Sequence, residues 1–137
     1  CGADITRIRK VFREEFSDYQ AKADAIGRAD IYRDYYAIST LGKQGEDSPT
    51  VLCAKAANEL LNIRGIKASV VMTKVEDTVF ISARSIDEMN VQVLMEKLGG
   101  GGHRTVAGAQ MQGMEVEECI KKVKEAIDEM IIEGEVA

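Results

Sequence analysis

The sequence predicts an α/β fold: a small mixed β-sheet flanked by helices, with a long helix at the N-terminus. Segments rich in β-forming residues alternate along the chain with segments in which apolar residues recur every three or four positions. The 137 residues are 45% hydrophobic and 30% charged, a balance that suits one globular core. We therefore expect the order β-α-β-β-α-loop-β-α after the N-terminal helix.

The first predicted element is an amphipathic helix over residues 4–26, which would serve as a connection or pack against a neighbouring segment. Its apolar stripe consists of Ile5, Ile8, Phe12, Phe16, Tyr19, Ala23 and Ile26. Residues 30–40, "DIYRDYYAIST", predict a strand. The glycines and the proline of residues 41–49 end that strand.

A second helix begins at Ser48, whose hydroxyl suits the N-cap, with Pro49 at the first helical position. We expect it to extend to residue 63, just before Gly65. Its apolar stripe is formed by Ala56, Ala57, Leu60 and Leu61.

Two β-rich runs, residues 68–75 and 78–84, flank a polar pair and predict a hairpin. The spacing of Ser85 and Glu88 fits a capping box that opens the next helix. That helix would bury one side, which consists of Val91, Leu94, Met95 and Leu98.

Four consecutive glycines, residues 99–102, run directly into His103, the chain's one histidine. After them we expect a short helical turn over residues 103–108 and a brief strand over residues 109–112. The last helix covers residues 115–134 and is cleanly amphipathic. Its predicted buried face consists of Val116, Ile120, Val123, Ile127 and Met130.

Charge and composition limit the functions that the chain can have. A net charge of -5 and a pI near 5.0, without a basic stripe, argue against a partner such as long duplex nucleic acid. No run approaches the length of a membrane span, and the N-terminus has no signal-peptide pattern. Cys1, Cys53 and Cys119 follow no metal spacing, so Cys53 and Cys119 are expected as small buried residues in a reducing, cytoplasmic setting. Because the chain does not open with Met, we expect a processed or excised piece.

The glycine run lacks the lysine and hydroxyl residue that close a phosphate-binding P-loop, and it does not fit G-x-G-x-x-G. One histidine cannot build a dinuclear metal site. Two interpretations remain: a flexible loop, or bare backbone N–H groups that bind a phosphate beside His103 and Arg104. The apolar helix before the run and the small residues 107–109 after it are not typical of a linker.

The segment "GGGGHRTVAGAQ" resembles the GGGH-x-x-A-G signature of the DHHA1 domain, the C-terminal substrate-binding half of DHH-family phosphoesterases. Upstream, "ISARS" and "EMNVQVLMEKLGGGGH" are similar to the strand end and helix that precede this motif in the family. The resemblance covers roughly residues 30 to 130 and is strongest to the membrane-anchored bacterial branch that hydrolyses cyclic di-AMP. Val106 departs from the alanine that many relatives carry, which weakens an oligoribonuclease interpretation.

The resemblance implies that the chain is the substrate-binding half of a phosphodiesterase that converts cyclic di-AMP to pApA. Residues 1–28 would be a linker helix and residues 29–137 the DHHA1 domain. The two Mn²⁺ ions of the family would be held by a preceding DHH domain of the same chain, so this chain alone is expected to lack a catalytic metal site and to be inactive. The domain would be cytoplasmic in a membrane-anchored parent protein, with a homodimer possible.

The substrate-binding residues that the resemblance implies are Arg84, Ser85, Asn90, Gly100, Gly101, Gly102 and His103. An arginine suits this role because its planar fork meets phosphate oxygens in pairs. Ser85 and Asn90 are the weaker candidates, since Ser85 also fits a purely structural cap. We expect Gly101 to adopt a positive φ, so that valine there would strain the backbone as well as block a substrate.

Two other functions remain open from the sequence. The same fold would serve an oligoribonuclease or exonuclease that binds short single-stranded nucleic acid. A non-catalytic dimerisation module would use the helix over residues 4–26.

Overall fold

The computed structural model describes residues 5–42 and 48–134, with side chains from Phe16 onward. Its elements, in order, are α1 (Ile5–Gly27), β1 (Asp30–Tyr32), β2 (Tyr36–Thr40), α2 (Pro49–Leu61), β3 (Ala68–Val75), β4 (Thr78–Ser85), α3 (Val91–Lys97), β5 (Gly101–Gly102), β6 (Val106–Gln112) and α4 (Val116–Glu133). Helices thus flank a mixed sheet, which confirms the predicted fold class.

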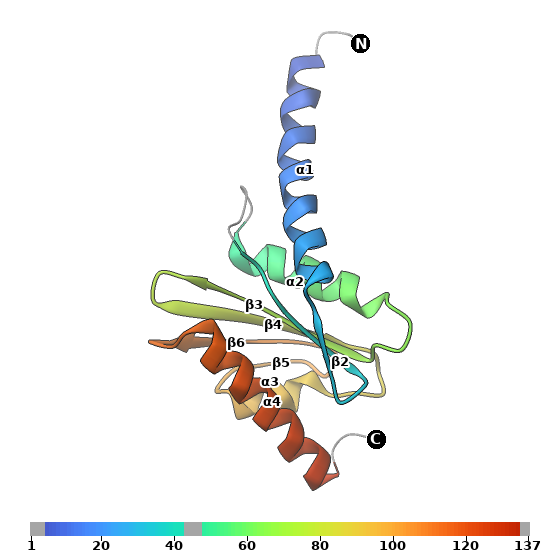
Figure 1. Ribbon diagram of the computed structural model, residues 1–137, viewed down its shortest axis with the longest axis vertical. Helices are drawn as coiled ribbons and strands as arrows, with labels where there is room; N and C mark the ends of the chain where they lie inside the picture. Colours follow the sequence, from blue (N-terminus) through green and yellow to red (C-terminus); the bar gives the residue numbers. More distant parts are fainter. Residues whose placement is uncertain (1–4, 43–47, 135–137) are drawn as a thin grey trace.

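The strands form one six-stranded sheet in the order β1-β2-β3-β4-β6-β5. β2 and β3 are parallel, and the other neighbours pair antiparallel. α2 is the crossover between the two parallel strands, a connection that parallel pairing requires. Helices α1 and α2 lie on one side of the sheet and α3 and α4 on the other (Figure 1).

Each face of the sheet has its own apolar core. On the side of α3 and α4, the alternate residues Val79, Ile81 and Ala83 of β4 pack with Leu94 of α3 and Ile127 of α4. The last helix packs as predicted through Val123, Ile127 and Met130, while Val116 and Ile120 are only partly buried.

On the other face, Ala37 and Val71 of the sheet pack with Leu52, Cys53 and Leu60 of α2. Burial raises the pKa of the Cys53 thiol to about 12, and Cys119 is buried too, as predicted for both cysteines. Cys1 lies outside the described residues.

The last turns of α1 join this second core through Ala25, which is fully buried, while the rest of the helix extends away from the sheet (Figure 1). Phe16 and Tyr19 are 53% and 63% exposed. The side chains of Ile5, Ile8 and Phe12 lie outside the described ones. The division into a linker helix and a domain at residue 28 stays a prediction.

Local signals explain several boundaries. Ser48 caps α2 by accepting a hydrogen bond from the backbone N–H of Val51, with Pro49 in the first turn, as predicted. The predicted hairpin of β3 and β4 is confirmed, and its turn places Glu76 at a φ of 57°. Within the described residues, no helix combines the length and apolar content needed to span a bilayer.

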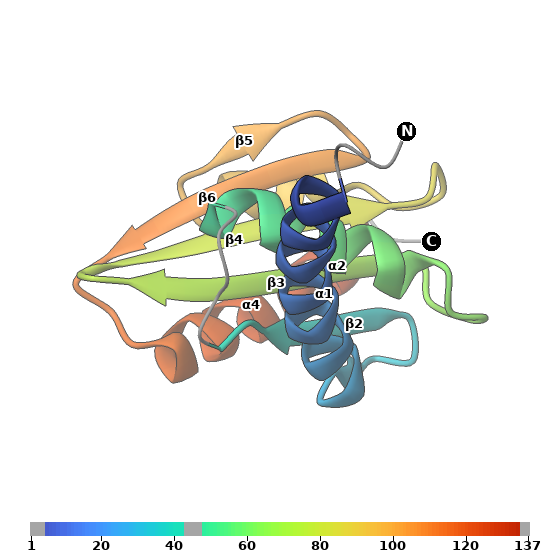
Figure 2. The same cartoon turned by 90° about the horizontal axis from the view of Figure 1, so that it is seen from above.

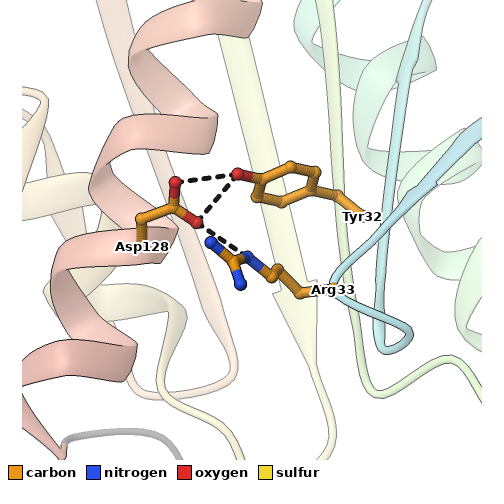
Figure 3. A network of polar contacts seen from close by, with 3 residues as sticks. All are labelled: Tyr32, Arg33 and Asp128. Carbon is orange, nitrogen blue, oxygen red and sulfur yellow. Dashed lines mark hydrogen bonds and ion pairs between the residues drawn. The ribbon is translucent and has the colours of Figure 1, made fainter.

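The predicted strand over residues 30–40 is wrong in one respect. It folds into two antiparallel strands, because Arg33 and Asp34 adopt φ angles of 54° and 69° and turn the chain back. The turn is fixed to α4: Asp128 accepts hydrogen bonds at 2.8 Å from the Tyr32 hydroxyl and at 2.9 Å from Arg33 Nε (Figure 3). A third anchor is the ion pair between Lys124 and Asp30, at 3.0 Å.

Two predictions around the glycine run are also wrong. Ser85 does not open the next helix; it ends β4, and Asn90 caps α3 by accepting from the N–H of Val93 at 3.2 Å. Residues 103–108 do not form a helical turn. Residues from Val106 to Gln112 instead form the long strand β6, which pairs with β4 along its whole length. Tertiary pairing therefore overrides the weak local preference of this small-residue segment.

Candidate functional site

The first two glycines of the run complete the end of α3. Gly99 adopts a φ of +86° and donates its N–H to Glu96 O at 3.0 Å. Gly100 N–H donates to Met95 O at 2.8 Å. This pair of bonds is a Schellman motif, in which a left-handed residue, usually glycine, satisfies the last carbonyls of a helix. Helix termination thus accounts for glycine at position 99.

Gly100, together with Gly102, also lets the loop lie directly on β6. A Cβ added to Gly100 would be 2.1 Å from Gly108 O, and one added to Gly102 would be 2.5 Å from Val106 O. Gly102 also has a φ of +145°. Any side chain at these positions would push β5 away from β6, so both glycines are required by packing.

Gly101 differs from its neighbours. Its φ lies outside the positive range, and nothing lies within 4 Å of the position where its Cβ would be. The prediction of a positive φ at Gly101 is therefore wrong, because the left-handed positions are Gly99 and Gly102. The fold has room for a side chain at position 101, so packing within the chain does not explain why this residue is glycine.

Arg84 lies near the end of β4 and pairs across the sheet with Val106. The guanidinium is half-buried, and its described hydrogen bond goes from Nη1 to the carbonyl of the preceding residue, Ala83, at 2.8 Å. No ion pair joins it to an acidic side chain among the described residues. Burial lowers the pKa of Arg84, since the charged form loses hydration. A cation in this environment is suited to an anionic ligand.

His103 lies in the turn that joins β5 to β6 and is exposed. Its backbone N–H donates to Val106 O at 2.7 Å, and the backbone N–H of Ser85 donates to Thr105 O at 3.0 Å. These bonds place the His103 turn beside the strand end that carries Arg84. The structure thus brings the end of the interior strand β4, which carries Arg84, beside the His103 turn and the glycine loop, which lie at the β5 edge of the sheet (Figure 2).

The weaker candidates have structural partners. The Ser85 hydroxyl lies 3.2 Å from Arg104 O and 3.3 Å from Met89 O, and is buried. The Asn90 side chain is occupied by the cap of α3. Arg104 is exposed, but its Nε donates to Asp87 O at 2.9 Å. These contacts fix the turn against β4.

A hollow of about 470 Å³ lies beside the loop, on the sheet face that carries α2. Its lining includes Phe80 and Ser82 of β4, Gln110 of β6, and Thr50 from the first turn of α2. Sequence reasoning missed these residues, although the alternation of β4 gives a signal. Val79, Ile81 and Ala83 face the α3 side, so Phe80, Ser82 and Arg84 must share the other face.

Among the described residues, no group of three or more His, Cys, Asp or Glu side chains is placed to hold a metal ion. The described residues therefore offer no donor set for Mn²⁺.

Comparison with protein families matches residues 34–133 to the DHHA1 domain. With its mixed sheet and the glycine loop at the sheet edge, the chain belongs to the DHHA1 domain family. This confirms the resemblance carried by the sequence motifs.

The relatives include phosphodiesterases. The cyclic-di-AMP phosphodiesterase GdpP of Bacillus subtilis is 42% identical over 130 residues, which are 93% of this chain and 20% of that protein. The protein of the same name from Geobacillus thermodenitrificans is 44% identical over 127 residues, 92% of this chain and 19% of the relative. The chain spans about a fifth of the length of these curated relatives.

Among solved structures, an exopolyphosphatase-related protein from Bacteroides fragilis superposes with a TM-score of 0.72 at 23% identity, covering 83% of this chain and 35% of that one. The C-Ala domain of Aquifex aeolicus alanyl-tRNA synthetase gives a TM-score of 0.54 at 16% identity, covering 72% of this chain and 96% of that one. At such identities the likeness concerns the fold alone.

Proposed function

We propose that this chain is the substrate-binding part of a longer phosphodiesterase that hydrolyses cyclic di-AMP to pApA, and that Arg84 and His103 bind a substrate phosphate beside Gly101. The observation that carries the proposal is the environment of Arg84. It is a half-buried cation with no acidic partner among the described residues, at the end of β4 beside the turn that follows the glycine loop. The names of the relatives supply the substrate.

The proposed chemistry is recognition. A guanidinium donates two parallel hydrogen bonds to phosphate oxygens, and a charged acceptor makes such bonds stronger than neutral ones. The exposed imidazole of His103 supplies a further donor, and Gly101 leaves room for close approach to the backbone. Hydrolysis itself would depend on a preceding DHH domain with two Mn²⁺ ions. The parent would be membrane-anchored, with this domain on the cytoplasmic side.

The test is made in the longer protein, with Arg84→Ala and His103→Ala against Arg64→Ala, an exposed arginine at the end of the α2 segment. Loss of hydrogen bonds to a charged phosphate costs about 1.5–3 kcal/mol, so each site variant is expected to lose roughly tenfold or more in cyclic di-AMP hydrolysis. The control is expected to keep its activity, and melting temperatures and Mn²⁺ content are expected to stay near wild type.

Wild-type activity in both site variants would refute the site. A titration of the 137-residue chain with cyclic di-AMP, pApA and a short RNA separates the alternatives, because preferential RNA binding would favour an oligoribonuclease module. The oligoribonuclease alternative is supported by one relative, the bifunctional oligoribonuclease and PAP phosphatase NrnA of Thermus thermophilus, which is 37% identical over 67 residues. The chain by itself is expected to hydrolyse nothing, with or without Mn²⁺.

A further inference from the structure

One side of α1 packs against the rest of the domain. Ala25 is fully buried, and Ala21 is partly buried against the same core, to which α2 contributes most of the residues. Lys22 forms an ion pair with Glu59 of α2 at 3.4 Å. These contacts define which side of α1 the domain covers.

The opposite side of α1 is apolar and exposed. Phe16 and Tyr19 are 53% and 63% exposed, and Ala23 is exposed as well. At about 100° per residue, positions 16, 19 and 23 lie on the side of the helix away from position 25. Only Ile26, at the end of this stripe, is partly buried against the core. Large aromatic side chains gathered on an exposed helix side are typical of an interaction surface.

The apolar stripe of α1 has the same spacing when it is read from either end. Its members are Ile5, Ile8, Phe12, Phe16, Tyr19, Ala23 and Ile26. The steps are three and four residues from Ile5 to Phe12, and four and three from Tyr19 to Ile26. A two-fold axis near residue 16 therefore brings position 5 of one copy opposite position 26 of another, position 8 opposite 23, and position 12 opposite 19. Such a stripe is complementary to itself in an antiparallel pair.

The charges of α1 favour the same antiparallel arrangement. Its first part, residues 5–13, has no acidic residue and four basic ones, which are Arg7, Arg9, Lys10 and Arg13. Its second part, residues 14–27, has one basic residue, Lys22, and four acidic ones, which are Glu14, Glu15, Asp18 and Asp24. A parallel pair would align like charges, whereas an antiparallel pair aligns the basic part of each helix with the acidic part of the other.

We propose that α1 pairs antiparallel with α1 of a second copy of this chain, with the two apolar stripes in contact. Seven members over 21 residues give an average step of 3.5 residues, the period of a coiled coil. α1 has 23 residues, a length of about 34 Å, and extends away from the sheet, so a second helix has room to lie along it (Figure 1). The inference does not depend on the proposed function.

Sedimentation equilibrium of the 137-residue chain tests the pairing. The average mass is expected to rise from 15.0 kDa toward twice that value as the concentration increases through the micromolar range. Phe16→Glu and Tyr19→Glu are each expected to lower the association constant by about tenfold or more, because pairing would bury an unpaired carboxylate. Both positions are exposed, so circular dichroism is expected to show an unchanged fold. The matched control is Ile132→Glu, at an 84% exposed position of α4, which is expected to associate like the wild type.

Disulfide cross-linking tests the direction of the two helices. Single variants Ile8→Cys and Ala23→Cys are made in a Cys1→Ser background, in which the remaining cysteines, Cys53 and Cys119, are buried. An oxidised mixture of the two variants is expected to yield a dimer that joins one copy of each. Ile8→Cys alone is expected to remain unlinked, whereas a parallel pair would link it to itself.

A charge exchange tests the electrostatic part of the argument. The helical period puts positions 9 and 24 on the same side of the stripe, and an antiparallel pair brings these sides of the two copies together. Arg9→Glu is expected to weaken association by roughly threefold or more, since the symmetry repeats each lost charge pair. Arg9→Glu combined with Asp24→Arg is expected to restore it.

Three results would each overturn the proposal. The first is a wild type that stays monomeric throughout this range, which would leave the stripe to a different partner, such as another part of a longer chain. The second is equal association of the two stripe variants and the Ile132→Glu control. The third is cross-linking of Ile8→Cys to itself in place of the mixed dimer.

Discussion

Single replacements of Gly101 and Gly100 by alanine distinguish two roles of the glycine run, room for a substrate at Gly101 and close packing on β6 at Gly100. A Cβ at Gly100 would be 2.1 Å from Gly108 O and 2.7 Å from the Cα of Ala109. Both are parts of the β6 backbone, which cannot yield as the end of a flexible side chain would. At Gly101 the same methyl group would have nothing within 4 Å.

The magnitudes follow from these distances. Gly101→Ala is expected to raise the free energy of unfolding by about 0.4–1 kcal/mol, because alanine restricts the unfolded chain and fits the native backbone. Gly100→Ala is expected to lower it by about 1–3 kcal/mol, the usual cost of forcing an extra methyl group into a packed site. Two alanines one residue apart should therefore shift stability in opposite directions.

Urea denaturation followed by circular dichroism measures both effects, and cyclic di-AMP titration of the same proteins measures the functional one. Under the proposed function, Gly101→Ala binds more weakly than wild type although its fold is at least as stable. A loss of more than about 1 kcal/mol in Gly101→Ala, or no loss in Gly100→Ala, would show that the packing argument is wrong. Unchanged binding by Gly101→Ala would show that no substrate approaches this residue closely.

Two further predictions concern α4. Ile127→Ala, at a fully buried position, is expected to lower the free energy of unfolding by about 2–5 kcal/mol in urea denaturation, and a loss below about 0.5 kcal/mol would mean that α4 is not packed as described. The hydrogen bond from Tyr32, and then the hydrogen bond and charge of Arg33, lower the pKa of Asp128. The Asp128 carboxylate therefore stabilises the fold above the pKa that this carboxyl has in the unfolded chain. That stabilisation is lost as the pH falls through the lower pKa of the folded state. Stability measured from pH 7 down to pH 2 should therefore fall less steeply in Asp128→Asn than in wild type or in the exposed control Glu125→Gln, and identical profiles would contradict this.

The predictable parts of the fold are those with local signals. Ser48 and Pro49 mark the start of α2 through the chemistry of capping, and the 3.6-residue period of α4 identifies its buried face. The turn at Arg33 and Asp34 has no such signal, because neither residue is the glycine that a positive φ usually indicates. The tie of this turn to Asp128, 95 residues away, is a tertiary interaction that a local pattern does not contain.

The site likewise has features that a local sequence motif predicts and features that depend on tertiary contacts. The sequence motif located Arg84, His103 and the glycine loop, and the structure places the end of β4 that carries Arg84 beside the turn that carries His103. It could not distinguish the glycines from one another, because that distinction depends on how close β6 lies. Nor could it place Ser82 in the lining of the hollow, since that requires knowing which strand and which residue lie opposite.

The acidic character of the chain is compatible with an anionic ligand because several of its carboxylates are paired with lysines and none of the described ion pairs includes Arg84. Acidic side chains pair with Lys67, Lys74, Lys97 and Lys124, at distances between 2.7 and 3.3 Å. Arg84 makes no such pair among the described residues, and none of the described residues that line the neighbouring hollow is charged. Interactions between exposed charges are screened beyond about 8–10 Å at moderate salt, so the groups nearest the ligand decide its binding more than the net charge of -5 does. A short nucleotide that contacts a single unpaired arginine fits this distribution, whereas a long polyanion that follows the surface would meet the acidic faces.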